Sequence, residues 1–188
     1  MNWVKERETR QQVSEKKLAE NLEKLKEMFG TIKLECLWLP RPASNYPGCY
    51  PLGFEKFIKK WLGTSNYVHF FAGLSKTGYR IDINPDVKPD LVANVENLKE
   101  IKDEFFEGGI ADPPYNEHFA KDLYNCKYPV WSKWTREIVR IVKVNGLIAI
   151  MHNYPLPCPV NCEYVKIFVV LMRIKQFPRV ITVFRRVR

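Results

Sequence analysis

The sequence of 188 residues has no long hydrophobic run. No apolar stretch reaches the roughly 20 residues that a membrane-spanning helix needs, and the charged N-terminus has no apolar core of the kind found in signal peptides. Internal repeats and low-complexity tracts are absent as well. The five cysteines are an odd number without regular spacing, which fits a reducing compartment better than a disulfide framework. We therefore expect a soluble cytoplasmic protein with one main domain.

Signatures of several enzyme classes are also missing. The three histidines do not stand in an arrangement typical of a Ser/His/Asp or Cys/His catalytic set. His69 lies in an apolar stretch, which is more typical of a core residue than of a ligand. Cys158 and Cys162 are candidates for zinc binding, but their spacing is looser than in a zinc ribbon. We expect an ordinary loop there and predict no metal site.

Negative charge is scarce. The chain has 30 Lys and Arg residues against 21 Asp and Glu residues, which gives a net charge of +9. The excess is uneven, since the segment 163–188 contains seven basic residues and a single acid, Glu163. Such a balance suggests an anionic partner, typically nucleic acid. A basic surface also keeps ordinary proteins soluble, so charge alone does not identify the partner.

The patterns that are present alternate between helix and strand, which predicts an α/β layered domain. Leucines at three- and four-residue spacing predict an N-terminal helix over residues 3–29, and we treat 1–30 as a unit preceding a domain at 31–188. So narrow an apolar stripe usually docks on the parent domain, with homodimerisation through a coiled coil as the alternative. The domain is predicted to contain strands at 32–39, 67–71, 80–84, 110–112 and 147–151, a strand and turn at 90–98, and a terminal hairpin of two strands at 165–172 and 179–185. Helices are predicted at 52–62 and 131–144, a turn at 145–146, an irregular loop at 40–51 and a mobile loop at 116–128.

The most specific stretch is Ile-Ala-Asp-Pro-Pro-Tyr-Asn at 110–116. Proline fixes its own φ and holds the residue before it extended, so we expect a strand that ends in a stiff tip. The tip presents the Asp112 carboxylate and the Tyr115 ring in fixed relative positions. A planar group with an amine on its edge, such as a nucleobase, suits that arrangement. A strand that merely turns in a tight loop fits the composition equally well.

Asp-Pro-Pro-Tyr at 112–115 resembles the catalytic motif of the S-adenosylmethionine (SAM)-dependent amino-methyltransferases. Members of that family methylate exocyclic nitrogens of nucleobases, most often the adenine amine in DNA. The resemblance covers residues 40–188 and implies a Rossmann-like class I methyltransferase sheet with flanking helices and SAM as cofactor. The interval from Gly73 to Asp82 is too short for the helix that normally joins the first two strands, so we expect an abbreviated or antiparallel connection there.

The resemblance also implies which residues hold the cofactor. A proline-rich loop lines the methionine end of SAM, a glycine turn approaches it closely, and an acid at a strand end accepts hydrogen bonds from ribose. Two positions depart from the family pattern: Ser75 replaces a glycine, and Asn94 replaces an acid that binds the adenine amine. An Asn carbonyl still accepts a hydrogen bond, although Asn94 fits a helix cap equally well. The implied cofactor residues are Tyr46, Gly48, Pro51, Phe71, Ala72, Gly73, Ser75, Asp82, Asn94 and Asp112.

The implied chemistry centres on the amine of a base. The Asp112 carboxylate and the Pro113 carbonyl would accept hydrogen bonds from the amine, and Tyr115 would stack on the ring of the base. The base would have to be flipped out or already single-stranded. Phe119 or Trp131 would form the opposite wall. The implied catalytic residues are Asp112, Pro113, Pro114 and Tyr115, and the implied substrate-binding residues are Tyr115, Asn116, His118 and Phe119.

We therefore expect a methyltransferase acting on a nucleobase amine, with adenine N6 in DNA favoured and bases in transfer or ribosomal RNA as the alternative. No segment is left for a target-recognition domain, so specificity would come from the chain itself, a second copy or a partner. The departures at Ser75 and Asn94 favour a different class, a non-catalytic subunit that binds nucleic acid. The intact motif at 112–115 favours the enzyme.

Overall fold

The described residues of this computed structural model are 33–42, 49–172 and 178–188, and they form a mixed sheet covered by helices. The predicted N-terminal helix and the implied cofactor residues Tyr46 and Gly48 lie outside the described residues. All that is described belongs to one unit, Lys33–Arg188. No helix in these ranges is long and apolar enough to span a membrane.

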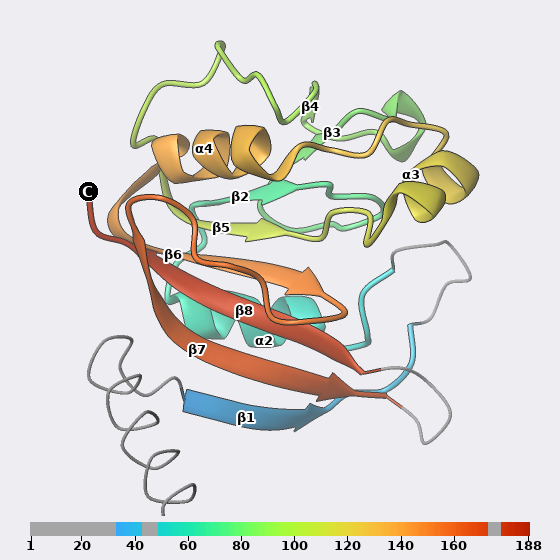
Figure 1. Cartoon of the computed structure of the whole chain (residues 1–188), viewed down its shortest axis with the longest axis vertical. Helices are drawn as coiled ribbons and strands as arrows, with labels where there is room; N and C mark the ends of the chain where they lie inside the picture. The colour runs from blue at the N-terminus through green and yellow to red at the C-terminus, as the bar shows by residue number, and fades with distance from the viewer. Residues whose placement is uncertain (1–32, 43–48, 173–177) are drawn as a thin grey trace, which may run out of the picture. The chain divides into compact units, whose positions relative to one another are not determined.

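Within the described ranges the sheet has eight strands in the order β1-β7-β8-β6-β5-β2-β3-β4 (Figure 1). The last strand, β8, runs antiparallel to both of its neighbours, and all other pairs are parallel. The predicted terminal hairpin is therefore confirmed as β7 and β8. The strands are β1 Lys33–Trp38, β2 Tyr67–Phe70, β3 Tyr79–Asp82, β4 Leu91–Val92, β5 Phe106–Ala111, β6 Val142–His152, β7 Cys162–Leu171 and β8 Arg179–Arg186.

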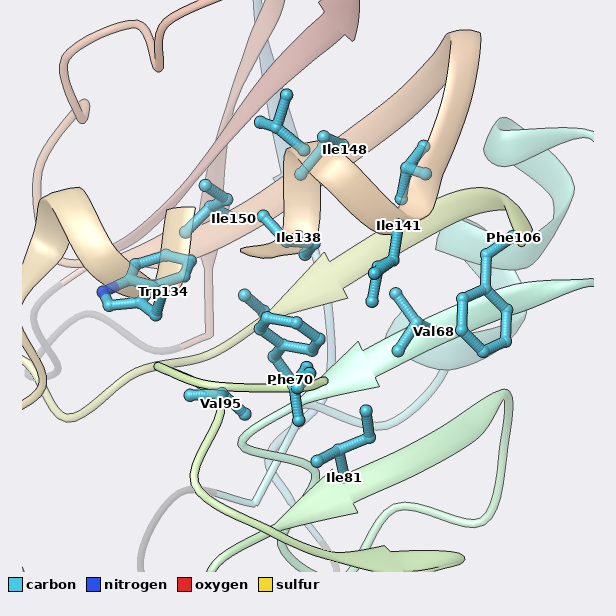
Figure 2. Close-up of a cluster of buried hydrophobic side chains, with 14 of the residues drawn as sticks. Val68, Phe70, Ile81, Val95, Phe106, Trp134, Ile138, Ile141, Ile148 and Ile150 are labelled. Atoms are coloured by element: carbon cyan, nitrogen blue, oxygen red, sulfur yellow. The ribbon is translucent and has the colours of Figure 1, made fainter. Parts of the chain in front are cut away.

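Helices lie on both faces of the sheet. They are α2 (Phe54–Leu62), α3 (Glu117–Tyr124) and α4 (Trp131–Ile141), with a 3₁₀ turn at Pro85–Val87. One face packs Val68, Phe70, Ile148 and Ile150 against α4 (Figure 2). The other face packs alternate strand residues, such as Ala149 and Met151, against α2. Because both faces are covered, the central strands β2 and β5 are buried along almost their whole length, as parallel strands generally are.

The connection between β2 and β3 is abbreviated, as predicted, and the two strands are parallel rather than antiparallel. Residues 71–78 join them without a helix. A dozen or more residues are usual for such a crossover. Here both strands are four residues long, so at roughly 3.3 Å per residue the chain has only a short distance to return.

A salt-bridged arginine holds the connection between β4 and β5, which also has no helix, against α4. Arg140 donates to the main-chain oxygens of Leu98 and Ile101, at 2.8 Å in each case. Glu137, one turn earlier on α4, accepts from the Leu98 N–H at 2.8 Å. These bonds satisfy main-chain groups that a helix would otherwise satisfy internally.

Two sequence predictions are wrong in detail. The helix predicted at 131–144 ends at Ile141, and β6 begins at Val142, so the predicted turn at 145–146 lies inside a strand. Asn145 has a φ of 68°, and this local irregularity is what the Asn-Gly pair encodes. The loop predicted at 116–128 contains α3 instead, which the Asn116 side chain caps and whose Ala120 is buried.

Candidate cofactor and substrate site

The candidate site lies at the carboxyl edge of the parallel strands, the edge toward which the arrowheads of β2 and β5 point and where α3 stands in Figure 1. Phe71 follows β2, Asp82 ends β3, Asp112 follows β5 and His152 ends β6. Ligands of open α/β sheets bind outside this edge. The antiparallel β8 starts at the same edge, because its Val180 pairs with His152.

A cleft beside the glycine turn joins the implied cofactor residues to the motif. It has a volume of about 240 Å³, and its walls include Phe71, Gly73, Asp82, Asp112 and Pro114. A second hollow of about 90 Å³ adjoins it, since the two share Phe71, Asp82, Ile83, Pro114 and Cys126, and it extends the cleft to Asn94 and Val95. We call the two together the cofactor cleft.

Asp82 shapes one wall of this cleft. Its Oδ2 accepts from the Gly73 N–H at 2.8 Å, and its Oδ1 accepts from the Asn84 N–H at 2.9 Å. The carboxylate therefore holds the glycine turn and retains lone pairs for a ligand hydroxyl. Phe71 has a φ of 57° and Gly73 a φ of 49°. The left-handed conformation is costly for Phe71, and such strain is concentrated at ligand sites.

Three of the implied cofactor residues line a different cavity. Pro51, Ala72 and Ser75 face a space of about 510 Å³ between the turn and the start of α2. The Ser75 hydroxyl donates to the Glu55 carboxylate, so the residue that replaces the family's glycine ties the turn to α2. Its side chain is buried in that contact and is not among the lining of the cofactor cleft.

Asn94 serves a turn as well as the cleft. Its Oδ1 accepts from the Glu96 N–H at 3.0 Å, which is an Asx turn and not a helix cap, because no helix follows. Asn94 also lines the hollow at the end of the cofactor cleft, where its amide can still meet a ligand.

The Asp112 carboxyl group is the most perturbed acid of the site. Its Oδ1 is buried and has no hydrogen-bond partner within the described ranges. Burial raises the pKa of Asp112 to about 7, against the opposing effects of Arg179 and the Tyr115 hydroxyl. An unpartnered, buried carboxyl oxygen at the wall of a cleft marks a position where a ligand supplies the missing hydrogen bond.

Sequence reasoning missed the residues that surround Asp112. Arg179 donates to the Cys49 main-chain oxygen at 3.1 Å, and its charge acts on both Asp112 and Tyr50. Its guanidinium lies over the Tyr115 ring, 6.0 Å from the centroid. Burial, followed by the charge of Asp112, raises the pKa of Tyr50. No local pattern could have indicated these partners, because they come from a loop and a strand far from the motif in sequence.

His69 is a satisfied core histidine, as predicted. It is fully buried, its Nε2 lies 2.8 Å from the Tyr50 hydroxyl, and its Nδ1 lies 3.4 Å from the Thr77 main-chain oxygen. Burial lowers the pKa of His69 to about 4, so the ring is neutral at pH 7. Because the carbonyl oxygen of Thr77 can only accept, Nδ1 carries the proton and the Tyr50 hydroxyl donates to Nε2.

An aromatic pocket lies on the other side of the motif. It has a volume of about 150 Å³ and is lined by Pro113, Tyr128, Trp131, His152 and Tyr154, among others. The Tyr154 ring meets the His152 ring edge-on at a centroid distance of 4.2 Å. His152 is buried, and its Nδ1 has no hydrogen-bond partner among the described atoms. A pocket of this size suits a single planar ring system, since drug-sized ligands occupy larger cavities.

The implied substrate residues beyond Tyr115 lie on or beside α3. The Asn116 side chain accepts from the Phe119 N–H at 2.8 Å and caps the helix. His118 pairs with Asp122 at 3.0 Å on the exposed side, and Phe119 is 39% exposed. None of the three lines the cofactor cleft or the aromatic pocket. Of the two candidates for an opposite wall, Trp131 is the one that lines the aromatic pocket.

Cys158 and Cys162, the two candidate zinc ligands, are partly buried. Burial raises the pKa of Cys158 to about 11 and that of Cys162 to about 12, so both are thiols at pH 7. Over the described ranges no three His, Cys, Asp or Glu side chains gather in a way that would hold a metal ion.

Comparison with solved structures identifies the fold. TrmN from Thermus thermophilus matches with a TM-score of 0.51 and 15% identity over 70% of this chain and 48% of TrmN. A methyltransferase in complex with the Haloferax volcanii Trm112 methyltransferase activator matches at 0.52 and 11% identity, over 71% of this chain and 88% of that one. The Burkholderia thailandensis 1,6-didemethyltoxoflavin-N1-methyltransferase, solved with S-adenosylhomocysteine, matches at 0.52 and 10% identity, over 73% and 78%.

The fold is therefore defined: the chain has a Rossmann-like α/β fold like that of class I methyltransferases, as predicted. This chain spans about half the length of TrmN. No family model matches the sequence, and no curated protein matches it either. Below 25% identity the likeness concerns the fold, so activity has to be argued from the site.

Proposed function

We propose that this protein is a SAM-dependent methyltransferase that acts on an exocyclic amine of a nucleobase, with adenine N6 in DNA as the first candidate. The observation that carries the proposal is the buried, unpartnered carboxyl oxygen of Asp112 in the wall of the cofactor cleft. A hydrogen-bond donor is missing there, and the amine of a base is a donor of the right kind. Bases in RNA carry the same amines and are the second candidate.

The cofactor cleft fits SAM by the chemistry of its walls. Asp82 is the acceptor for ribose hydroxyls, the hollow with Ile83 and Asn94 takes the adenine, and the turn at Gly73 leads toward Asp112. A similar fold holds S-adenosylhomocysteine in the Burkholderia enzyme. SAM, when bound, supplies a methyl group on a positively charged sulfur. The protein then has to bring a nitrogen lone pair to that methyl group.

Asp112 acts on the nitrogen in two ways. As a carboxylate it accepts a hydrogen bond from the amine. This bond directs the nitrogen lone pair, which is otherwise delocalised into the base, toward the methyl group. As the new N–C bond forms, the bond between that carbon and the sulfur would break with its electrons left on sulfur, and the nitrogen would carry a positive charge and one proton too many. A carboxylate whose pKa lies near 7 is suited to receive that proton, because a base works best when its pKa is close to the working pH.

The aromatic pocket is the proposed binding site of the target base. Its wall at Pro113 adjoins Asp112 in sequence, and Pro114 forms a wall of the cofactor cleft, so the two prolines stand between the cavities. Stacking on Tyr115 stays a prediction. The Arg179 guanidinium lies 6.0 Å over that ring, whereas a base between them needs two contact layers of about 3.5 Å each. Arg179 would therefore have to move.

The test is methyl transfer from labelled SAM to single- and double-stranded DNA, to RNA and to free nucleosides, with the modified base identified by mass spectrometry. Asp112→Ala should abolish transfer while SAM still binds, as measured by calorimetry. Turnover of that variant at the parental rate would refute the role of Asp112. SAM binding without transfer to any of these substrates would favour the non-catalytic subunit instead.

A further inference from the structure

A basic groove lies along α4 and the end of β8. It has a volume of about 600 Å³, and no acid is among the residues that line it. Figure 1 shows the chain end marked C near the end of α4, where Arg186 donates to the Arg140 main-chain oxygen at 3.2 Å. We call this cavity the arginine groove after the four arginines of its walls, Arg136, Arg140, Arg186 and Arg188.

Two of the four guanidinium groups are engaged within the protein. Arg140 pairs with two carboxylates at 2.6 and 2.9 Å, and Arg186 pairs with Glu104 at 3.1 Å. Arg136 and Arg188 are exposed, and their side chains have no carboxylate partner among the residues that the structure describes. Two charges are thus free to bind an anion, and the guanidinium group matches phosphate with two parallel hydrogen bonds.

The arginine groove lies next to the aromatic pocket, because Trp131 lines both. The aromatic pocket in turn has Pro113 as a wall, next to Asp112. It holds the His152 Nδ1, buried and without a partner in the described ranges, which a ring N–H or amine of a ligand would satisfy. The motif, the aromatic pocket and the two arginines without a carboxylate partner are therefore neighbours in that order.

We propose that the arginine groove binds the phosphodiester backbone of an unpaired nucleic-acid strand, one base of which enters the aromatic pocket. The proposal rests on the proposed function, since that strand presents its base to Asp112. Alternation of basic groups with aromatic stacking surfaces is how proteins hold single strands. An intact duplex would keep its bases stacked and out of the pocket. The two free arginines would contact phosphates on the strand leading away from the base.

The test is binding of a labelled single-stranded oligonucleotide of about 12 nucleotides, as DNA and as RNA of the same sequence, over a range of salt concentrations. The variant replaces both free arginines, Arg136→Ala with Arg188→Ala. Each phosphate contact adds about 0.7 to the slope of log affinity against log salt for single strands. We expect a slope smaller by about 1.4 and an affinity roughly tenfold weaker at about 0.1 M salt.

The matched control is Lys59→Ala with Lys60→Ala, which removes the same charge from exposed positions on α2, on the other face of the sheet. It should bind as tightly as the parent protein. A loss confined to the groove variant, in either the DNA or the RNA arm, supports the proposal. Equal loss in both variants would mean that only net charge matters, and that result would overturn it.

Single charge reversals, Arg136→Glu in the groove and Lys60→Glu as its control, repeat the comparison in case the alanine substitutions have too small an effect. The affinity of each variant for SAM is measured to check that it is folded. Groove variants that bind like the parent protein would overturn the groove even if methyl transfer is observed. Absence of methyl transfer together with weaker binding by the groove variants would leave the groove standing and refute the proposed reaction.

Discussion

Asp112→Asn should make the protein more stable at alkaline pH while removing its activity. The pKa of Asp112 lies at about 7 in the folded chain, against an ordinary value of 3.8. Because this folded-state pKa is raised, the native protein holds a proton that the unfolded chain has lost. The contribution of this group to the free energy of unfolding is therefore fully present below its ordinary pKa, and it is lost as the pH rises through about 7.

The magnitude follows from the shift. About three pKa units at about 1.4 kcal/mol each give an upper limit of about 4 kcal/mol for the cost of the buried charge above the folded-state pKa. Roughly half of that is lost between about pH 5.5 and about pH 8.5. Asparagine keeps the shape and stays neutral, so the advantage of Asp112→Asn should grow by about 2 kcal/mol over this interval.

The assay is urea unfolding of both proteins at the two pH values, with methyl transfer measured in parallel. All other titrating groups are common to the two proteins and cancel in the difference. A difference in unfolding free energy between the two proteins that does not change with pH would refute the reasoning. It would mean that the Asp112 carboxyl group is not in a buried environment that disfavours its charged form. The parental rate should also rise with pH through about 7, as the carboxylate forms.

Three further outcomes are expected. Gly78→Ala should destabilise the fold by about 1–3 kcal/mol, because φ is 74° at Gly78 and a Cβ would lie 2.4 Å from the Tyr67 ring; an unchanged thermal midpoint would contradict this. Asp82→Ala should weaken SAM binding measured by calorimetry, and an unchanged dissociation constant would place the ribose contact elsewhere. Tyr50→Phe should cost about 1–3 kcal/mol in urea unfolding, since it leaves the buried His69 Nε2 without its donor; equal stability of both proteins would show that the ring finds another partner.

The strands and the motif could be predicted from sequence because their signals are local. Apolar runs bounded by glycine, proline and polar residues placed the carboxyl ends of β2, β3 and β5 within one or two residues of where these strands end. Proline after Asp112 implied an extended strand end, and the structure has one. The prediction failed where local signals compete. Asn145-Gly146 is typical of a turn, yet it lies in an irregular part of β6, whose pairing with β5 stops at Val142 and resumes at Leu147.

The site could be predicted only in part. Gly73, Asp82 and Asp112 meet in one cleft because parallel strands end at one edge of the sheet. Ser75 and Pro51 do not join them, since the turn is bonded to α2 through Glu55 and that side of it faces another cavity. That bond joins residues 20 positions apart, and no spacing rule indicates it.

By itself the sequence determined the alternation of strands and helices and a stiff acidic tip, because proline geometry and side-chain periodicity act between neighbouring residues. Only the tertiary structure decided what that tip becomes. It buries the Asp112 carboxyl group, brings Arg179 and Tyr50 near it, and places an aromatic pocket next to an arginine groove at Trp131. Burial and electrostatic interaction depend on distance in space, and distances between such separated residues exist only once the sheet has formed.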